Sequence, residues 1–111
     1  MTRFSGEKVL MRIFIGENDK IGHRPLHEVL VEFFKKEGFA GATVLRGVSG
    51  FGANSLIHTD KLLRLSLDLP IIIEVVESQE KIDAVMPRID EMMGGGMITM
   101  EKATVIRYSH K

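Results

Sequence analysis

Two clusters of glycine have the composition of backbone sites for anions. Gly50 and Gly52 follow a predicted strand, and the three glycines at 94–96 follow a predicted helix. Successive backbone N–H groups in glycine-rich turns form concave anion sites, so each cluster could hold a phosphate. The sequence leaves it equally open that the first cluster only shapes a turn and the second only ends a helix. Neither GxxxxGK(S/T) nor GxGxxG occurs, so the common nucleotide-binding loops are not indicated.

Histidines and one strand carboxylate are the other candidates for chemistry. His23 and His27 have the i, i+4 spacing of a helical metal site, but HExxH is absent, and a solvated helix start is the favoured interpretation. His58 with Asp60 could bind a metal or act as a base, although no nucleophile stands in a recognisable setting. Glu74 interrupts an apolar strand. It either faces solvent at a subunit boundary or is held by a partner, and in the second case it is a functional candidate.

The composition is that of one soluble globular domain and argues against several classes of function. Hydrophobic residues make up 44% of the 111 residues and charged residues 27%, which argues against disorder and against a membrane span. Fifteen Lys and Arg balance fifteen Asp and Glu, so nucleic acid is disfavoured as a partner. Because cysteine and an apolar signal segment are both absent, we expect a cytoplasmic protein without disulfides. The neutral net charge also removes a barrier to self-association.

Hydrophobic periodicity predicts four strands and two helices in a single domain over residues 1–111. The strands cover 7–16, 42–48, 69–77 and 97–108, and the helices run from 25 to 36 and from an N-cap at 78 to the glycines at 94–96. Pro25 suits a first helical position, Gly38 suits a helix stop, and Pro87 predicts a kink rather than a break. Residues 49–68 form a connection longer than compact domains usually keep without a use for it.

The order of these elements predicts the fold class. Strand, helix, two strands, helix and strand give an α+β, ferredoxin-like βαββαβ sandwich, in which two helices cover one face of a four-stranded antiparallel sheet. The other face of the sheet is left bare. Because the strand over 69–77 is apolar on both faces, we expect the bare face to pack against another copy of the chain.

Four motifs, in this order and at this spacing, carry a family resemblance that covers nearly the whole chain. They are Gly41-Ala-Thr-Val-Leu-Arg-Gly47, Gly50-Phe51-Gly52, Asp68-Leu-Pro70 and Ile73-Glu-Val-Val76. On these residues the chain resembles the PII signal-transduction proteins, and more closely the PII-like family of uncharacterised bacterial and archaeal proteins. The resemblance implies a PII-like trimer with ligand clefts between subunits. The base of a T-loop-like connection (49–68), the turn after the second helix and the final strand would form each cleft.

Adenine nucleotides bind in these clefts in PII, and the resemblance carries the site to this chain by position. Gly50, Phe51, Gly52 and Ala53 would line the phosphate side, Glu74 and Val76 would lie near adenine or ribose, Arg107 would pair with phosphate, and Gly94, Gly95 and Gly96 would match the phosphate-binding turn. That turn is shorter than in PII and lacks its lysine, and Ser109 lies near the place of a second arginine. Fewer cations favour ADP or AMP over ATP, because each charge-assisted phosphate contact removed leaves charge for water to screen.

The resulting hypothesis is a non-catalytic, trimeric regulator that binds an adenine nucleotide and switches the 49–68 connection to contact a partner. The partner would be an unidentified target protein, of which a membrane transporter is one kind, and no metal is required. A metal- or small-ion-responsive trimer like the divalent-cation tolerance proteins, which share the architecture, is the alternative. A small ferredoxin-like enzyme with His58 or Glu74 as base ranks last, because no nucleophile, metal cluster or cofactor motif accompanies them.

Overall fold

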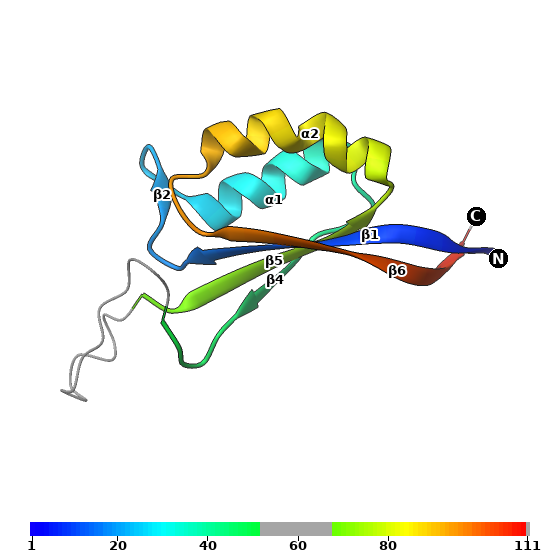
Figure 1. Ribbon diagram of the computed structural model, residues 1–111, viewed down its shortest axis with the longest axis horizontal. Coiled ribbons are helices and arrows are strands. Elements are labelled where there is room, and N and C mark those ends of the chain that lie inside the picture. Colours follow the sequence, from blue (N-terminus) through cyan, green and yellow to red (C-terminus); the bar gives the residue numbers. More distant parts are fainter. Residues whose placement is uncertain (52–67, 111) are drawn as a thin grey trace.

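The computed structural model describes residues 1–51 and 68–110, and Figure 1 shows how their strands and helices are arranged. In chain order the elements are β1 (Thr2–Gly16), β2 (Lys20–Ile21), β3 (Arg24–Pro25), α1 (Leu26–Lys36), β4 (Thr43–Arg46), β5 (Pro70–Glu77), α2 (Gln79–Met92) and β6 (Met97–Ser109). Four strands form one antiparallel sheet in the order β4-β5-β1-β6, and both helices lie on the same face of it. The predicted ferredoxin-like fold is confirmed.

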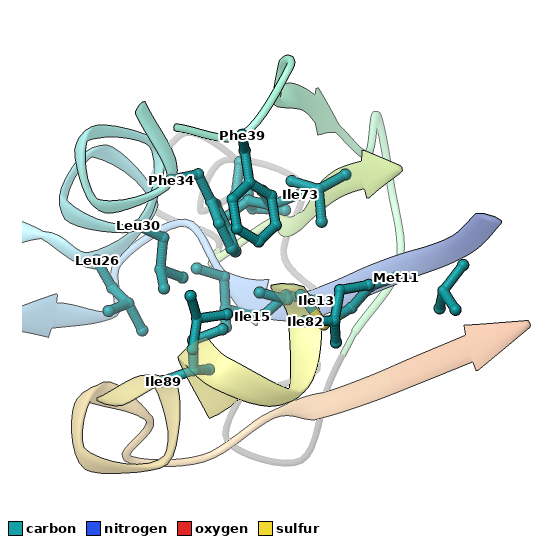
Figure 2. Close-up of a cluster of buried hydrophobic side chains, with 14 residues drawn as sticks. Met11, Ile13, Ile15, Leu26, Leu30, Phe34, Phe39, Ile73, Ile82 and Ile89 are labelled. Carbon is teal, nitrogen blue, oxygen red and sulfur yellow. The ribbon is translucent and has the colours of Figure 1, made fainter. Parts of the chain in front are cut away.

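The core lies between the helices and one face of the sheet, because apolar residues alternate along the two central strands. Every second residue of β1 from Val9 to Ile15 is buried, and so is every second residue of β5 from Ile71 to Val75. The helices bury one stripe each, Leu26, Leu30 and Phe34 on α1 and Ile82, Val85 and Ile89 on α2. Figure 2 shows these helix side chains meeting the strands.

The first helix matches the prediction except at its start. Pro25 precedes α1 and is not its first helical residue, because its ψ of 131° keeps it extended. In that conformation it pairs with Lys20 in the β2–β3 hairpin, which the polar segment 17–24 did not predict. Gly38 has a φ of +78°, the left-handed conformation expected of a helix stop.

The second helix begins and continues as its sequence predicts. The Ser78 hydroxyl accepts a hydrogen bond from the backbone N–H of Lys81 at 3.3 Å, which confirms the N-cap. The helix is continuous through Pro87, so the proline does not break it. It ends at Met92, and the glycines at 94–96 lead directly into β6.

The strands differ from the prediction mainly at the beginning of β1. Residues 2–8 pair with β6 alone, because β5 begins to pair at Val9. Residues 2–6 lie before the predicted start of this strand at residue 7. They are exposed or half-buried, so no apolar alternation indicated them. We call residues 2–8 with their partners 103–109 the arm. β4 is shorter than the predicted 42–48, and Pro70 starts β5 as expected.

The sheet face opposite the helices, here called the open face, is apolar but uncovered in one chain. Strand register places Phe14 and Ile72 on it half-buried, and Leu45, Val76 and Met97 exposed. The apolar character of β5 on both faces is therefore real, although only the residues facing the helices are buried. Packing of the open face against another copy stays a prediction.

Candidate functional site

A groove of about 390 Å³ lies where the arm meets β4 and β5. Its lining comes from four segments: Phe4 and Lys8 of β1, residues 40–43 before and at the start of β4, residues 74–77 of β5, and Val105 and Arg107 of β6. Glu74, Val76 and Arg107, which come from two strands and were predicted as site residues, all line it. The groove therefore brings together the residues of β5 that were predicted to contact base or ribose and the arginine of β6 that was predicted to contact phosphate.

Glu74 is held by an arginine on the neighbouring strand. Its Oε2 accepts a hydrogen bond from Arg12 Nε at 2.7 Å, and Arg12 Nη1 donates to Glu101 at 3.1 Å. The hydrogen bond to Glu74 raises the pKa of Arg12. The Glu74 side chain is 28% exposed. It has a partner, supplied by its own chain, but it is half-buried and not fully buried as the second sequence alternative required. Its Oε1 receives no hydrogen bond from the described residues and is available to a ligand hydroxyl.

A second carboxylate positions the loop that closes one side of the groove. Glu77 is buried, with 8% of its surface exposed, and its Oε2 accepts the backbone N–H of Ala40 at 2.8 Å. Lys81 Nζ lies 3.8 Å from the same oxygen, and it also donates to the carbonyl of Gly38. These contacts fix the segment 38–42 against β5, because a buried carboxylate that is hydrogen-bonded and paired would be costly to release.

Gly50 of the first glycine cluster lies beside the beginning of β5 and does not line the groove. Gly50 has a φ of +135°, and a Cβ there would stand 3.3 Å from Pro70. The backbone N–H of Gly47 donates to the carbonyl of Pro70 at 2.8 Å. Phe51 is 69% exposed, whereas Gly52 and Ala53 lie outside the described residues.

The second glycine cluster lies at the same end of the sheet. Gly96 has a φ of +99°, and a Cβ on it would collide with the carbonyl oxygen of Phe14. Since Pro70 pairs with Gly16, close to Phe14, both glycine clusters flank the carboxyl end of β1. The fold itself therefore requires glycine at position 96, whether or not this turn binds a ligand.

Arg107, at one end of the groove, is separated from Gly50 and Gly96 within one chain. Arg107 pairs with Phe4 near the amino end of β1, whereas the glycines lie at its carboxyl end. With about 3.3 Å per residue, the ten steps along the strand from Phe4 to Phe14 span roughly 33 Å. One copy therefore does not bring Arg107 and its own glycine turns to the same phosphate group.

Three residues that line the groove, Phe4, Lys8 and Glu77, were not predicted as site residues from the sequence. Glu77 has the inward parity of Ile71 and Val75 and ends an apolar strand, which could have indicated a buried and satisfied carboxylate. Phe4 and Lys8 belong to the arm, whose pairing with β6 only the structure reveals.

The histidines do not form a metal site with other described residues. His23 is exposed and His27 half-buried, and residues 1–51 and 68–110 hold no group of three His, Cys, Asp or Glu side chains placed to bind a metal. His58 and Asp60 lie outside the described residues. Within the same ranges no helix is long and apolar enough to span a membrane.

The chain belongs to a family of uncharacterised proteins. The family model DUF190, described as Uncharacterized ACR, COG1993, matches residues 8–105. A UPF0166 protein of Aquifex aeolicus (strain VF5) is 35% identical over 102 residues, which cover 90% of this chain and 94% of that protein. A UPF0166 protein of Methanocaldococcus jannaschii is 32% identical over 99 residues, covering 88% and 91%.

Solved structures show that this chain has a PII-like fold. CPII from Thiomonas intermedia K12, a nitrogen regulatory PII-like protein, superposes with a TM-score of 0.58 at 15% identity in its complex with ADP and bicarbonate, covering 92% of this chain and 91% of CPII. A protein from Thermus thermophilus described as a putative PII-like signaling protein superposes with a TM-score of 0.57 at 19% identity, covering 93% and 91%. The resemblance to the PII-like family is confirmed.

Proposed function

We propose that this protein is a PII-like regulator that binds an adenine nucleotide in clefts between subunits. The observation that carries the proposal is that Glu74, Val76 and Arg107, which the resemblance to PII assigned to one cleft, line one groove. The likeness of fold to CPII, which has been solved with ADP and bicarbonate and with ADP, AMP and bicarbonate, supports it. The protein acts by binding and not by catalysis.

Each part of the groove suits a part of a nucleotide. The apolar side chains of Val76 and Val105 can contact a base, and the free Oε1 of Glu74 can accept a ribose hydroxyl. Arg107 can pair with a phosphate in the bidentate geometry that a guanidinium favours. The small number of cations in the groove favours ADP or AMP over ATP.

A complete cleft requires more than one copy. The glycine turns lie at the opposite end of β1 from Arg107, so a phosphate paired with Arg107 meets a glycine turn only if a neighbouring copy presents its own. A heterologous contact generates a ring when its rotation closes, and three copies related by a threefold axis give the trimer that the resemblance to PII implies. The apolar open face of the sheet would be buried in the same assembly.

The regulatory step is a change in the 49–68 connection. The described base of this connection is Gly47 to Gly50. The backbone N–H of Gly47 donates to the carbonyl of Pro70, which joins the base to the start of β5. Just before it, Arg46 Nε forms an ion pair with Glu17 Oε2 at 2.8 Å. Nucleotide phosphate bound against Gly50 would favour one arrangement of the connection, which then contacts or releases a target protein. Amide hydrogen exchange tests this step: ADP should change exchange within 49–68 more than in β2–β3, and equal rates with and without ADP would contradict it.

Isothermal titration calorimetry with ATP, ADP, AMP and cyclic AMP tests the binding itself. We expect saturable binding with ADP or AMP tighter than ATP, measured with and without bicarbonate because CPII was solved with that anion as well. Arg107→Ala should weaken binding about ten- to a hundredfold, because it removes a charge-assisted contact.

The matched control for that variant is Arg3→Ala. Arg3 lies in the arm beside Phe4 and pairs with Tyr108 in strand register, so it faces away from the groove. Its removal should leave nucleotide affinity unchanged. An absence of binding by all four nucleotides, or equal affinity for the wild type and Arg107→Ala, would overturn the proposed site.

A further inference from the structure

Phe4 and Lys8 turn one end of the groove into a cationic pocket. Directly opposite strand residues share a face, so Phe4, paired with Arg107, and Lys8, four residues further along the same strand, point to the same side of the arm. The two cations are about 13 Å apart along the strands at 3.3 Å per residue, a gap that their long side chains can close around an anion. Both line the groove.

A glycine allows the Phe4 ring to reach the lysine. A Cβ at Gly6 would stand 2.8 Å from Cζ of Phe4, so the ring lies across the Gly6 position, which separates Phe4 from Lys8. Lys8 Nζ lies 5.0 Å from the centroid of that ring, within the range of a cation–π contact. The ring therefore holds the ammonium group over the arm without neutralising it.

The charge of this end of the groove is uncompensated in the described part of the chain. Four other arginines, Arg12, Arg24, Arg46 and Arg88, each pair with a carboxylate. Lys8 and Arg107 pair with none of the described carboxylates. Glu74 and Glu101, which lie on the same face, are both engaged by Arg12, and Glu7 faces the other side of the arm beside Lys102. Two free cations facing one cavity favour an anionic ligand.

We infer that Lys8, placed by Phe4 and Gly6, is a second phosphate-binding cation of the groove. The inference rests on the proposed function and deepens it. Arg107 offers a planar fork to one phosphate, and Lys8 offers a compact point charge to the next, so the pair recognises a nucleoside diphosphate. The beginning of β1, which belongs to no predicted cleft element, thus sets the number of phosphates that the site prefers.

The test compares Lys8→Met with Lys102→Met, using ADP, AMP and adenosine as probes in calorimetry. Lys8→Met keeps the apolar stem and removes the charge. It should weaken ADP binding about tenfold, AMP binding less, and adenosine binding not at all, because only phosphate contacts the ammonium group. Lys102 lies on the same arm but on the opposite face, so Lys102→Met should change none of the three affinities.

Gly6→Ala supplies a second variant that keeps both charges. Its methyl group displaces the Phe4 ring, so ADP affinity should fall about threefold while adenosine affinity stays the same. If the wild type binds ADP and Lys8→Met binds it with equal affinity, the inference about Lys8 is wrong, whereas the proposed function stands. Equal losses of ADP and adenosine in Lys8→Met would also overturn the inference about Lys8, since they indicate a structural role. Failure of the wild type to bind any of the three probes would overturn the proposed function as well.

Discussion

Gly96 combines two constraints that no other residue type satisfies. Its φ of +99° lies in the region that L-residues avoid, and the carbonyl oxygen of Phe14 occupies the position of a Cβ. Gly94, two residues earlier, has no positive φ and open space around its Cβ position. The triple-glycine turn therefore contains one glycine required by the fold and another that is free for a different use.

Gly96→Ala should lower the free energy of unfolding by about 1–3 kcal/mol, because the residue is strained and its methyl group meets backbone rather than a movable side chain. Gly94→Ala should change it by less than about 0.5 kcal/mol. Urea denaturation followed by circular dichroism measures both. Equal stability of the two variants would show that the turn relaxes around the new methyl group.

At the level of residues, the sequence predicted part of the groove and missed the rest for identifiable reasons. Glu74, Val76 and Arg107 were predicted through a resemblance, and they lie together. Lys8 and Phe4 were missed because their position depends on pairing with residues about a hundred positions away in the chain, and periodicity reports only which face of its own strand a residue shares. Gly52 and Ala53 stay predictions.

The two helices are joined to each other by an ion pair at their edges. Arg88 of α2 donates to Glu37, the residue that follows α1, at 2.8 Å, and its guanidinium lies 5.0 Å from the ring centroid of Phe33. The hydrogen bond from Arg88 lowers the pKa of Glu37 below its ordinary value of 4.5. A carboxylate with a lowered pKa in the folded state stabilises the fold above the pKa of the unfolded state, and this contribution is lost as the pH falls through the folded pKa.

Glu37→Gln should therefore reduce stability at neutral pH and have little effect in acid. The difference between the urea midpoints of wild type and Glu37→Gln should be fully present well above pH 4.5 and should shrink as the pH falls below that value. Glu80→Gln is the control, since Glu80 lies in the first turn of α2 and forms none of the ion pairs described above. A midpoint difference that is constant from pH 7 to pH 3 would contradict the assigned role.

At the level of elements, prediction succeeded where the amphipathic pattern was strong. The stripes of α1 and α2 and the cap at Ser78 are as predicted, because burial against a sheet selects a 3.6-residue period. The β2–β3 hairpin and the start of β1 were missed. Their residues are polar or exposed, and backbone pairing rather than burial defines them. Pro25 was misplaced by one position because the hairpin and the helix share it.

The open face is the largest feature of the whole molecule that one chain leaves unexplained. Leu45 on the edge strand β4 is 44% exposed and Met97 on the opposite edge strand β6 is 53% exposed, with half-buried Phe14 and Ile72 between them. These apolar residues adjoin the ion pairs of Arg12 with Glu74 and Glu101 on the same face, and an exposed apolar patch rimmed by polar residues marks an interaction site. In the trimer the open face would be covered, and the grooves would meet the glycine turns of neighbouring copies.

Leu45→Glu and Met97→Glu should each shift the protein from trimer toward monomer, because a carboxylate buried in an interface is costly. Sedimentation velocity over a range of concentrations measures the shift. Ile21→Glu is the matched control, since Ile21 is an exposed apolar residue in the β2–β3 hairpin, outside the four-stranded sheet. If the wild type sediments as a monomer, or if both open-face variants stay trimeric, the open face is not the interface.

Native mass spectrometry of the wild-type protein with ADP tests the central claim most directly, because it reports the number of chains and the number of bound ligands in the same particle. A nucleotide bound between subunits predicts trimers that carry up to three ADP molecules and monomers that carry none. Monomers that bind ADP as readily as trimers, or trimers that bind none, would contradict the claim.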